Sequence, residues 1–311
     1  ERRKNGLFSD LFDFCRRIDK RLVNRRVIES LIRAGAFDSL CSNRASLMAS
    51  VGRAMEAAEQ HQKDQNQTSL FGASECHGTH GTHNLIDAAP WDEAERLALE
   101  KKALGFYFSG HPFNAYKAEL ASLARAGLAA LAPQPAPVYI AGIIAAVRIL
   151  QTRRGRMCFV TLDDAEAQVE VAIFGELFEA ERELLKEDNL LIVLGKVAND
   201  DYTGGLRVGA EQLFDLTRAR NRFAKRIELR CNGNSSAEAL VSLLKPFAGG
   251  DCSVEIAYRN ATAHCRIAAG QVRCEDPLIR SLRNRLSDEN VVIHYLPAAA
   301  PAAEFAQSAA F

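Results

Sequence analysis

The sequence of 311 residues contains no apolar run long enough to cross a membrane and no recognisable signal peptide. None of its eight cysteines forms a CxxC pair, so we expect reduced thiols that pack as small apolar residues. It also lacks a phosphate-binding GxxxxGK(S/T) loop and any recognisable arrangement of a nucleophile with a base. These absences argue against membrane-spanning, disulfide-stapled and P-loop proteins. They favour a cytoplasmic chain with no catalytic centre of its own.

Residues that commonly ligate metals occur in three groups, but none is spaced like a typical metal site. Residues 76–83 hold one cysteine and three histidines, whereas a tetrahedral zinc site normally uses two separated pairs. The pairs Asp163-Asp164 and Asp200-Asp201 fall at the ends of expected strands, where aspartate and glycine are ordinary turn formers. We therefore expect no metal ion and no cofactor in this chain.

Positive charge is concentrated near the start of the sequence, although 39 Lys and Arg balance 39 Asp and Glu overall. Residues 1–44 carry eleven Lys and Arg against six Asp and Glu. Such clustering suits contact with phosphate groups. A solvated helix face would have a similar composition, so the charge by itself leaves both interpretations open.

The first segment, residues 1–63, is expected to be helical. Val23, Val27 and Leu31 recur at helical spacing, backed by Ile28 and Ile32, and a second helix from about residue 43 carries Leu47, Val51 and Ala54 on one face. Between them, residues 23–40 (VNRRVIESLIRAGAFDSL) resemble a helix-hairpin-helix motif, in which a glycine turn presents backbone N–H groups to a DNA phosphate. The candidate DNA contacts are Arg25, Arg26, Arg33 and Gly35. The usual Gly-hydrophobic-Gly turn is reduced to Gly-Ala-Phe, so a plain helical packing turn fits equally well.

Residues 64–88 form a polar linker that contains one apolar pentapeptide, QTSLF. Neither flank can build a core, so Leu70 and Phe71 have no obvious place to be buried within their own segment. Two large apolar side chains on a polar tether are typical of an anchor for another protein's pocket. The Gln67 amide adds a donor and an acceptor, and Ser69 completes a pattern similar to the clamp-binding peptide of bacterial replication proteins. The alternative is a local turn that packs Leu70 and Phe71 onto neighbouring helices.

Residues 89–130 are expected to form a pair of helices. Pro90 suits a first turn, and the apolar face of the first helix consists of Leu97, Leu104 and Phe108. His111-Pro112 is expected to end that helix and to start the next one, which closes at Gly127. A Pro/Ala linker at 131–137 follows.

The stretch 138–218 has the element order of an OB-fold β-barrel, with three strands, a helix and two strands. Alternating apolar residues predict strands at 138–152, 156–163, 168–174, 190–197 and 206–214, and a helix at 175–186.

An OB-fold binds single strands across its second and third strands and at its first hairpin loop. The candidate contacts on that surface are Arg148, Arg153, Arg154, Arg156 and Phe159, the last placed to stack on a base. Because the stretch holds nine Lys and Arg against fourteen Asp and Glu, binding must come from the local loop. The other interpretation is an OB-fold that docks proteins.

Residues 225–296 alternate strand, helix, strand, strand, helix and strand, which indicates a small split βαβ (ferredoxin-like) domain. The expected elements are strands at 226–230, 253–258, 261–267 and 291–295, and helices at 236–244 and 277–286. An Ala/Pro-rich tail at 297–311 either docks on a partner or frays. The whole chain is therefore predicted to be a multidomain α+β protein.

Several of these strings together resemble the C-terminal part of the bacterial DNA polymerase III alpha subunit, the replicative C-family polymerase. They are LFDFCRRID (11–19), residues 23–40, QTSLF, the OB-like block from Val138 and, most specific, LGFYFSGHPF (104–113). The resemblance covers residues 1–296. It implies a portion of a DNA-directed DNA polymerase, a nucleotidyltransferase whose three metal-binding aspartates and magnesium lie upstream of Glu1. The chain alone is then expected to be inactive.

The resemblance also implies partners. The first segment would hold duplex DNA, the peptide at 67–71 would bind the sliding clamp (beta subunit), and the OB domain would lie near single-stranded template. The domain at 225–296 would bind the tau subunit of the clamp loader, beside other polymerase III core subunits. Two alternatives stay open: a non-catalytic adaptor whose OB-fold binds only proteins, and an enzyme with anticodon-like recognition of RNA.

Overall fold

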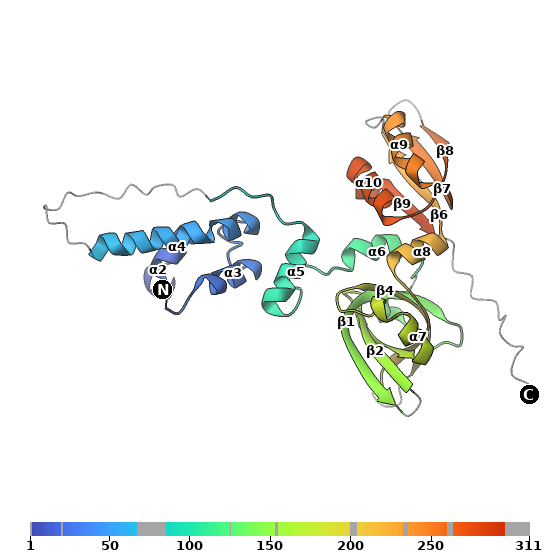
Figure 1. The fold of residues 1–311 in the computed structure, drawn as a ribbon, viewed down its shortest axis with the longest axis horizontal. Helices are drawn as coiled ribbons and strands as arrows, with labels where there is room; N and C mark the ends of the chain where they lie inside the picture. The colour runs from blue at the N-terminus through green and yellow to red at the C-terminus, as the bar shows by residue number, and fades with distance from the viewer. Residues whose placement is uncertain are drawn as a thin grey trace, which may run out of the picture. The chain divides into compact units, whose positions relative to one another are not determined.

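The computed structural model describes residues 2–19, 21–66, 85–124, 126–152, 155–199, 204–232, 236–259 and 264–295 (Figure 1). The chain divides into two compact units, Glu1–His111 and Pro112–Phe311, which are described separately. Within the described ranges, no helix combines the length and the apolar character that spanning a membrane requires.

The first unit is built from helices whose starts are set by local side-chain caps. Its helices are α1 (Arg2–Asn5), α2 (Leu11–Arg17), α3 (Arg25–Arg33), α4 (Arg44–Asn66) and α5 (Glu93–Leu104). Asp10, Asn24 and Asp92 each accept a hydrogen bond from the backbone N–H three residues on, which satisfies a donor that the helix itself leaves unpaired.

The helical prediction for this unit is confirmed, and one residue of a predicted face proves exposed. Leu47, Val51 and Ala54 are buried as expected. On α3, the predicted Ile28 and Ile32 are fully buried, whereas Val27 is 38% exposed. The two isoleucines lie four residues apart and belong to one apolar cluster with the neighbouring helices.

Helix α5 also ends earlier than expected. Its last residue is Leu104, and Gly105 follows in the left-handed region with φ +86°, a conformation that favours glycine. His111-Pro112 therefore does not end this helix. The predicted apolar face is buried only at Leu97; Leu104 and Phe108 are 37% and 71% exposed.

The second unit contains the predicted OB-type barrel. Its strands are β1 (Val138–Thr152), β2 (Gly155–Asp163), β3 (Gln168–Phe174), β4 (Leu190–Asn199) and β5 (Leu206–Phe214). They form a closed barrel in the order β1-β2-β3-β5-β4, in which β3 and β5 pair in parallel. The single expected helix at 175–186 is instead α7 (Gly175–Ala180) followed by a short 3-10 turn, η2 (Arg182–Leu184).

Apolar side chains that alternate along the strands fill the barrel, as the sequence predicts. Cys158, Val160 and Leu162 of β2 are fully buried together with Val171 and Ile173 of β3. Side chains at the intervening positions therefore lie on the outer face of the sheet.

The C-terminal part of the second unit is a four-stranded sheet with helices. Its elements are β6 (Ala224–Cys231), α9 (Ala237–Leu244), η3 (Lys245–Phe247), β7 (Ala248–Arg259), β8 (His264–Val272), α10 (Asp276–Leu286), η4 (Asp288–Asn290) and β9 (Val291–Tyr295). The predicted alternation of strands and helices is confirmed. The predicted split, in which another strand lies between the two parallel strands, is wrong. The strand order is β8-β7-β6-β9, and the parallel strands β6 and β7 are direct neighbours. Strand β8 pairs with β7 at the outer edge of the sheet instead of lying between the parallel strands.

Three further elements connect these parts: α6 (Asn114–Leu120), η1 (Leu128–Ala130) and α8 (Leu216–Phe223). The helices expected as a pair at 89–130 fall in different units, α5 in the first and α6 in the second. Leu120 of α6 shares one apolar cluster with Ile143 and Leu194 of the barrel and with Leu282 and Val291 of the C-terminal sheet domain.

Candidate nucleic-acid interface

The outer face of the barrel brings Arg148, Phe159 and Ala172 into one row. Arg148 of β1 is the register partner of Phe159 of β2, which in turn pairs with Ala172 of β3. Because cross-strand partners project to the same side of a sheet, these side chains share a face. It is the face that the sequence assigned to single strands.

Phe159 does not present an open ring on this face. Phe159 is only 8% exposed. The guanidinium carbons of Arg148 and Arg207 lie over its ring, 5.0 and 5.3 Å from the ring centroid. Cations stabilise the negative face of an aromatic ring. The planar groups available to a ligand here are therefore the two guanidinium groups, with Phe159 beneath them.

Glu170 of β3 links the two arginines. Nη2 of Arg148 donates to its Oε2 at 3.1 Å, and Nη2 of Arg207 lies 3.2 Å from its Oε1. Glu170 is half-buried, whereas Arg148 is 61% exposed along its side chain. Two cations thus share one carboxylate, which leaves a net positive charge for a phosphate to meet.

Arg207 was missed by the sequence-based prediction. It belongs to β5, which lies 37 residues beyond Glu170 and becomes its neighbour only because the barrel closes through the parallel β3–β5 pairing. No local pattern around residue 207 signals that pairing.

A second row on the same face is more apolar. Leu150, Met157 and Phe174 are register partners across β1, β2 and β3, and Phe174 is 53% exposed. Arg156 lies close by in the chain, with Nη1 3.6 Å from Oε1 of Glu179. An exposed phenylalanine on such a face can stack a base, as aromatic rings do in single-strand binding surfaces. Arg153 and Arg154, also predicted, lie outside the described residues.

The hairpin of the first unit uses its glycine for structure. Gly35 has φ +79°, its N–H donates to the carbonyl of Ile32, and the N–H of Ala36 donates to that of Leu31. This pair of bonds is a Schellman motif that ends α3. Both N–H groups are therefore satisfied within the chain, which agrees with the packing-turn alternative for residues 35–37.

The arginines predicted around that hairpin differ in their partners. Arg25 donates from Nε to Glu29 at 2.8 Å, and Arg33 lies 3.5 Å from the same carboxylate. Arg26 is exposed, with no ion-pair partner within the described ranges. The structure thus brings three of the candidates onto one helix, and two of them, Arg25 and Arg33, share Glu29.

A buried ion pair joins this hairpin to α5. Arg44 donates to both carboxylate oxygens of Asp38, at 2.7 and 2.6 Å, and from Nη1 to Oε1 of Glu100 at 2.7 Å. The other oxygen of Glu100 accepts the backbone N–H groups of Phe108 and Ser109 at 3.2 and 2.9 Å. Burial acts to raise the pKa of Glu100, but the Ser109 N–H and the Arg44 guanidinium hold it below its ordinary value. These bonds position the turn of LGFYFSGHPF, the most specific of the strings quoted from the sequence.

Comparisons with known proteins place the chain among replication proteins. The helix-hairpin-helix motif family matches residues 1–47, and the OB-fold nucleic acid binding domain family matches residues 138–216. DNA polymerase III subunit alpha of Neisseria meningitidis serogroup A is 40% identical and covers 86% of this chain and 23% of its own length. The subunits of Vibrio cholerae and Escherichia coli K12 are 35% and 33% identical, and each match covers 94% of this chain and 26% of the relative.

This chain belongs to the DNA polymerase III alpha-subunit family. It spans about a quarter of the length of these relatives and matches their C-terminal part. The resemblance stated from the sequence is therefore confirmed. Among solved structures, the second OB-fold domain of replication protein A from Methanococcus maripaludis matches 29% of this chain and 95% of that chain. Its identity is 17% and the TM-score 0.24, which is too low to add to the assignment.

In this alpha-subunit segment the candidate carboxylates act as turn formers. Asp164 is buried and accepts N–H groups from Glu166, Ala167 and Leu128. Asp163 accepts the N–H of Ala165 at 2.8 Å. Within the described ranges, no three His, Cys, Asp or Glu side chains are grouped so as to hold a metal ion.

The remaining predicted residues lie where the structure gives no description. They are the peptide residues Gln67, Ser69, Leu70 and Phe71, the Cys/His segment at 76–83, Asp200-Asp201 and the tail at 297–311.

Proposed function

We propose that this chain is the DNA-, sliding-clamp- and clamp-loader-binding part of a replicative DNA polymerase III alpha subunit, acting in the cytoplasm. The observation that carries the proposal is the arginine–aromatic face of the OB barrel, in a chain of a DNA polymerase family. Two arginines, Arg148 and Arg207, each lie over the ring of Phe159 there. The domain is otherwise rich in carboxylates, so this face is the place where a strand has phosphate partners.

Single-stranded template would bind by exchanging partners. A phosphate displaces Glu170 as the acceptor of Arg148 and Arg207, because phosphate oxygens match the guanidinium fork as well as a carboxylate does. Bases then stack on the exposed Phe174 and on the planar guanidinium groups. Such contacts carry no sequence information, which suits a template of any sequence.

The test is binding of a fluorescent single-stranded oligonucleotide to the full chain at several salt concentrations. Replacing Arg148 and Arg207 by Ala removes two phosphate partners. The slope of log K against log salt should therefore fall by about 1.4, at about 0.7 per contact for a single strand. The matched control is Arg182→Ala, an exposed arginine of the same barrel on η2. An unaltered slope, or no binding at low salt, would favour the adaptor that binds only proteins.

The clamp is proposed to bind the peptide at 67–71 through Gln67, Ser69, Leu70 and Phe71. The tau subunit is proposed for residues 225–296, and duplex DNA for the region of Arg25, Arg26 and Arg33. Polymerase activity, with its magnesium, belongs to the parent polymerase, and this chain by itself is proposed to be inactive. The family supports these roles, and the position of the peptide on a polar linker supports the first.

A further inference from the structure

The C-terminal sheet has one face that its helices leave uncovered. Ile227 and Leu229 of β6 are buried in the same cluster as Leu278 and Leu282 of α10. Strand alternation therefore turns Arg226, Glu228 and Arg230 to the opposite face. That face contains charged side chains from all four strands.

Two carboxylates on this face each have two basic side chains as partners. Glu228 lies 2.9 Å from Nε of Arg230 and 3.2 Å from Nε2 of His294. Glu255 lies 3.3 Å from Arg226 and 3.2 Å from Arg266. Three arginines and one histidine thus share two glutamates.

The excess positive charge is concentrated at one end of the strands. Arg230, Ala257 and Arg266 are register partners across β6, β7 and β8, and Arg259 pairs with His264 in the next row. These two rows contain no carboxylate. Arg259 and His264 have no ion-pair partner within the part of the chain that the structure describes.

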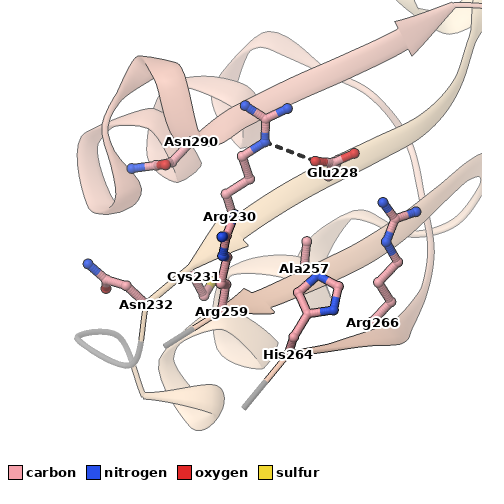
Figure 2. Close-up of a pocket in the computed structure, with 9 residues that line it drawn as sticks. All are labelled: Glu228, Arg230, Cys231, Asn232, Ala257, Arg259, His264, Arg266 and Asn290. Carbon is pink, nitrogen blue, oxygen red and sulfur yellow. Dashed lines mark hydrogen bonds and ion pairs between the residues drawn. The ribbon is translucent and has the colours of Figure 1, made fainter. Parts of the chain in front are cut away.

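The two rows border a hollow of about 340 Å³ (Figure 2). Its lining includes Arg230, Arg259, Arg266, His264 and one carboxylate, Glu228, which already pairs with Arg230. The small Ala257 separates the two arginines of its row, which leaves room for a group between them. Among the described residues, the lining has no phenylalanine, tyrosine or tryptophan to stack a base and no lysine.

We propose that this hollow binds a backbone phosphate of a nucleic-acid strand, independently of sequence and separately from the barrel face. Three guanidinium groups around one hollow match the charge and the several acceptor oxygens of a phosphodiester. A lining without aromatic rings fits contact with the backbone rather than with bases. The barrel in the same unit matches a nucleic-acid-binding family, which favours a strand over an acidic peptide as the occupant.

The experiment uses the full chain with Arg259→Gln and Arg266→Gln, which remove two guanidinium groups. Arg266→Gln leaves Glu255 with Arg226, and Arg259 has no ion-pair partner to lose among the described residues, so the fold should persist. Affinity for a fluorescent single-stranded oligonucleotide should fall at least threefold, and the salt slope by about 1. The matched control is Arg280→Gln, an exposed arginine of α10 on the helical side.

The same measurement is repeated in the Arg148→Ala, Arg207→Ala background. A further fall there supports a second, independent site. If the Gln variants lower oligonucleotide affinity in neither background, the proposal fails, whether or not the barrel face binds DNA.

A third arm of the experiment uses a polyglutamate peptide with the same charge as the oligonucleotide. If the Gln variants weaken that peptide and leave oligonucleotide affinity unchanged, the surface binds an acidic protein segment and the proposal fails. If the double variant unfolds at a lower temperature than the parent, the same binding measurements are made with Arg259→Gln alone.

Discussion

At the scale of single residues, Glu170 controls what the barrel face offers to a ligand. Its carboxylate holds Arg148 and Arg207 at 3.1 and 3.2 Å, over the ring of Phe159. A partly exposed pair of this kind contributes little to stability, because water and salt screen it. Its effect is on binding, since each phosphate contact has to replace a contact with Glu170.

Replacing Glu170 by Gln is expected to tighten single-strand binding by up to about fivefold, the equivalent of about 1 kcal/mol for releasing exposed pairs. The change removes the competing carboxylate and keeps its shape. Fluorescence anisotropy of a labelled oligonucleotide measures the effect. Glu176→Gln, which removes an exposed carboxylate of the barrel on α7, controls for net charge. Weaker or equal binding of Glu170→Gln would show that the carboxylate does not compete with phosphate.

At the scale of elements, Glu119 of α6 connects four pieces of the second unit. Arg220 of α8 donates to both of its oxygens, at 2.7 and 2.8 Å. Arg283 of α10 and the hydroxyl of Tyr295 on β9 donate at 2.8 and 2.7 Å. Arg220 also pairs with Asp276, whose other oxygen accepts from Thr217. The helix before the barrel and the helix after it are thereby joined to the C-terminal sheet domain.

The ionisation of Glu119 makes this connection sensitive to acid. Burial acts to raise its pKa, but hydrogen bonds and charge from Arg220, with Tyr295 and Arg283, hold the pKa below the ordinary 4.5. The folded state therefore binds fewer protons than the unfolded state between the lowered pKa and 4.5. Its stabilising contribution is complete above 4.5 and is lost as the pH falls through the lowered value.

Glu119→Gln is expected to reduce the stability of the second unit at pH 7 by about 3 kcal/mol or more, because it leaves the buried Arg220 with only the partly exposed Asp276 as a counter-charge. The variant should also lose less stability than the parent as the pH falls below 4.5. Urea unfolding followed by circular dichroism at neutral and acid pH measures both effects. Glu187→Gln, at an exposed position, is the control. Equal stability of parent and Glu119→Gln would contradict the role assigned to the network.

At the scale of the whole molecule, we propose a set of DNA- and protein-contacting parts joined by linkers. The polar stretch at 64–88 overlaps the end of α4 and precedes α5 in the sequence of the first unit. A weak anchor on such a stretch would make each re-engagement with a clamp nearly intramolecular, at effective concentrations on the order of millimolar. Long synthesis would then need no tight and slowly released contact with DNA.

Leu70→Ala with Phe71→Ala is expected to weaken clamp binding at least about 30-fold, since the two apolar anchors that are removed together contribute about 2 kcal/mol or more. The fold should be unchanged, because the residues lie in the linker segment. Binding of the full chain to immobilised clamp, with circular dichroism as the check on folding, tests this. Thr68→Ala, at the position where the peptide pattern accepts any residue, is the control. Undiminished affinity of the double variant would refute the anchor.

What the sequence determined by itself is local. Alternation at period two places β1, β3, β5 and β9 at their predicted bounds, and a serine before an apolar run starts α9 at Ala237. Strong strings such as LGFYFSGHPF identify the family. All of these signals lie within a few residues of the structure that they specify.

Only the tertiary structure decided which distant residues meet. Arg207 reaches Glu170 because the barrel closes, Glu100 reaches Arg44 across 56 residues, and Tyr295 reaches Glu119 across 176. The order of the C-terminal strands was settled in the same way. Such pairings come from burying apolar faces against each other over the whole chain, and no short window of sequence contains that information.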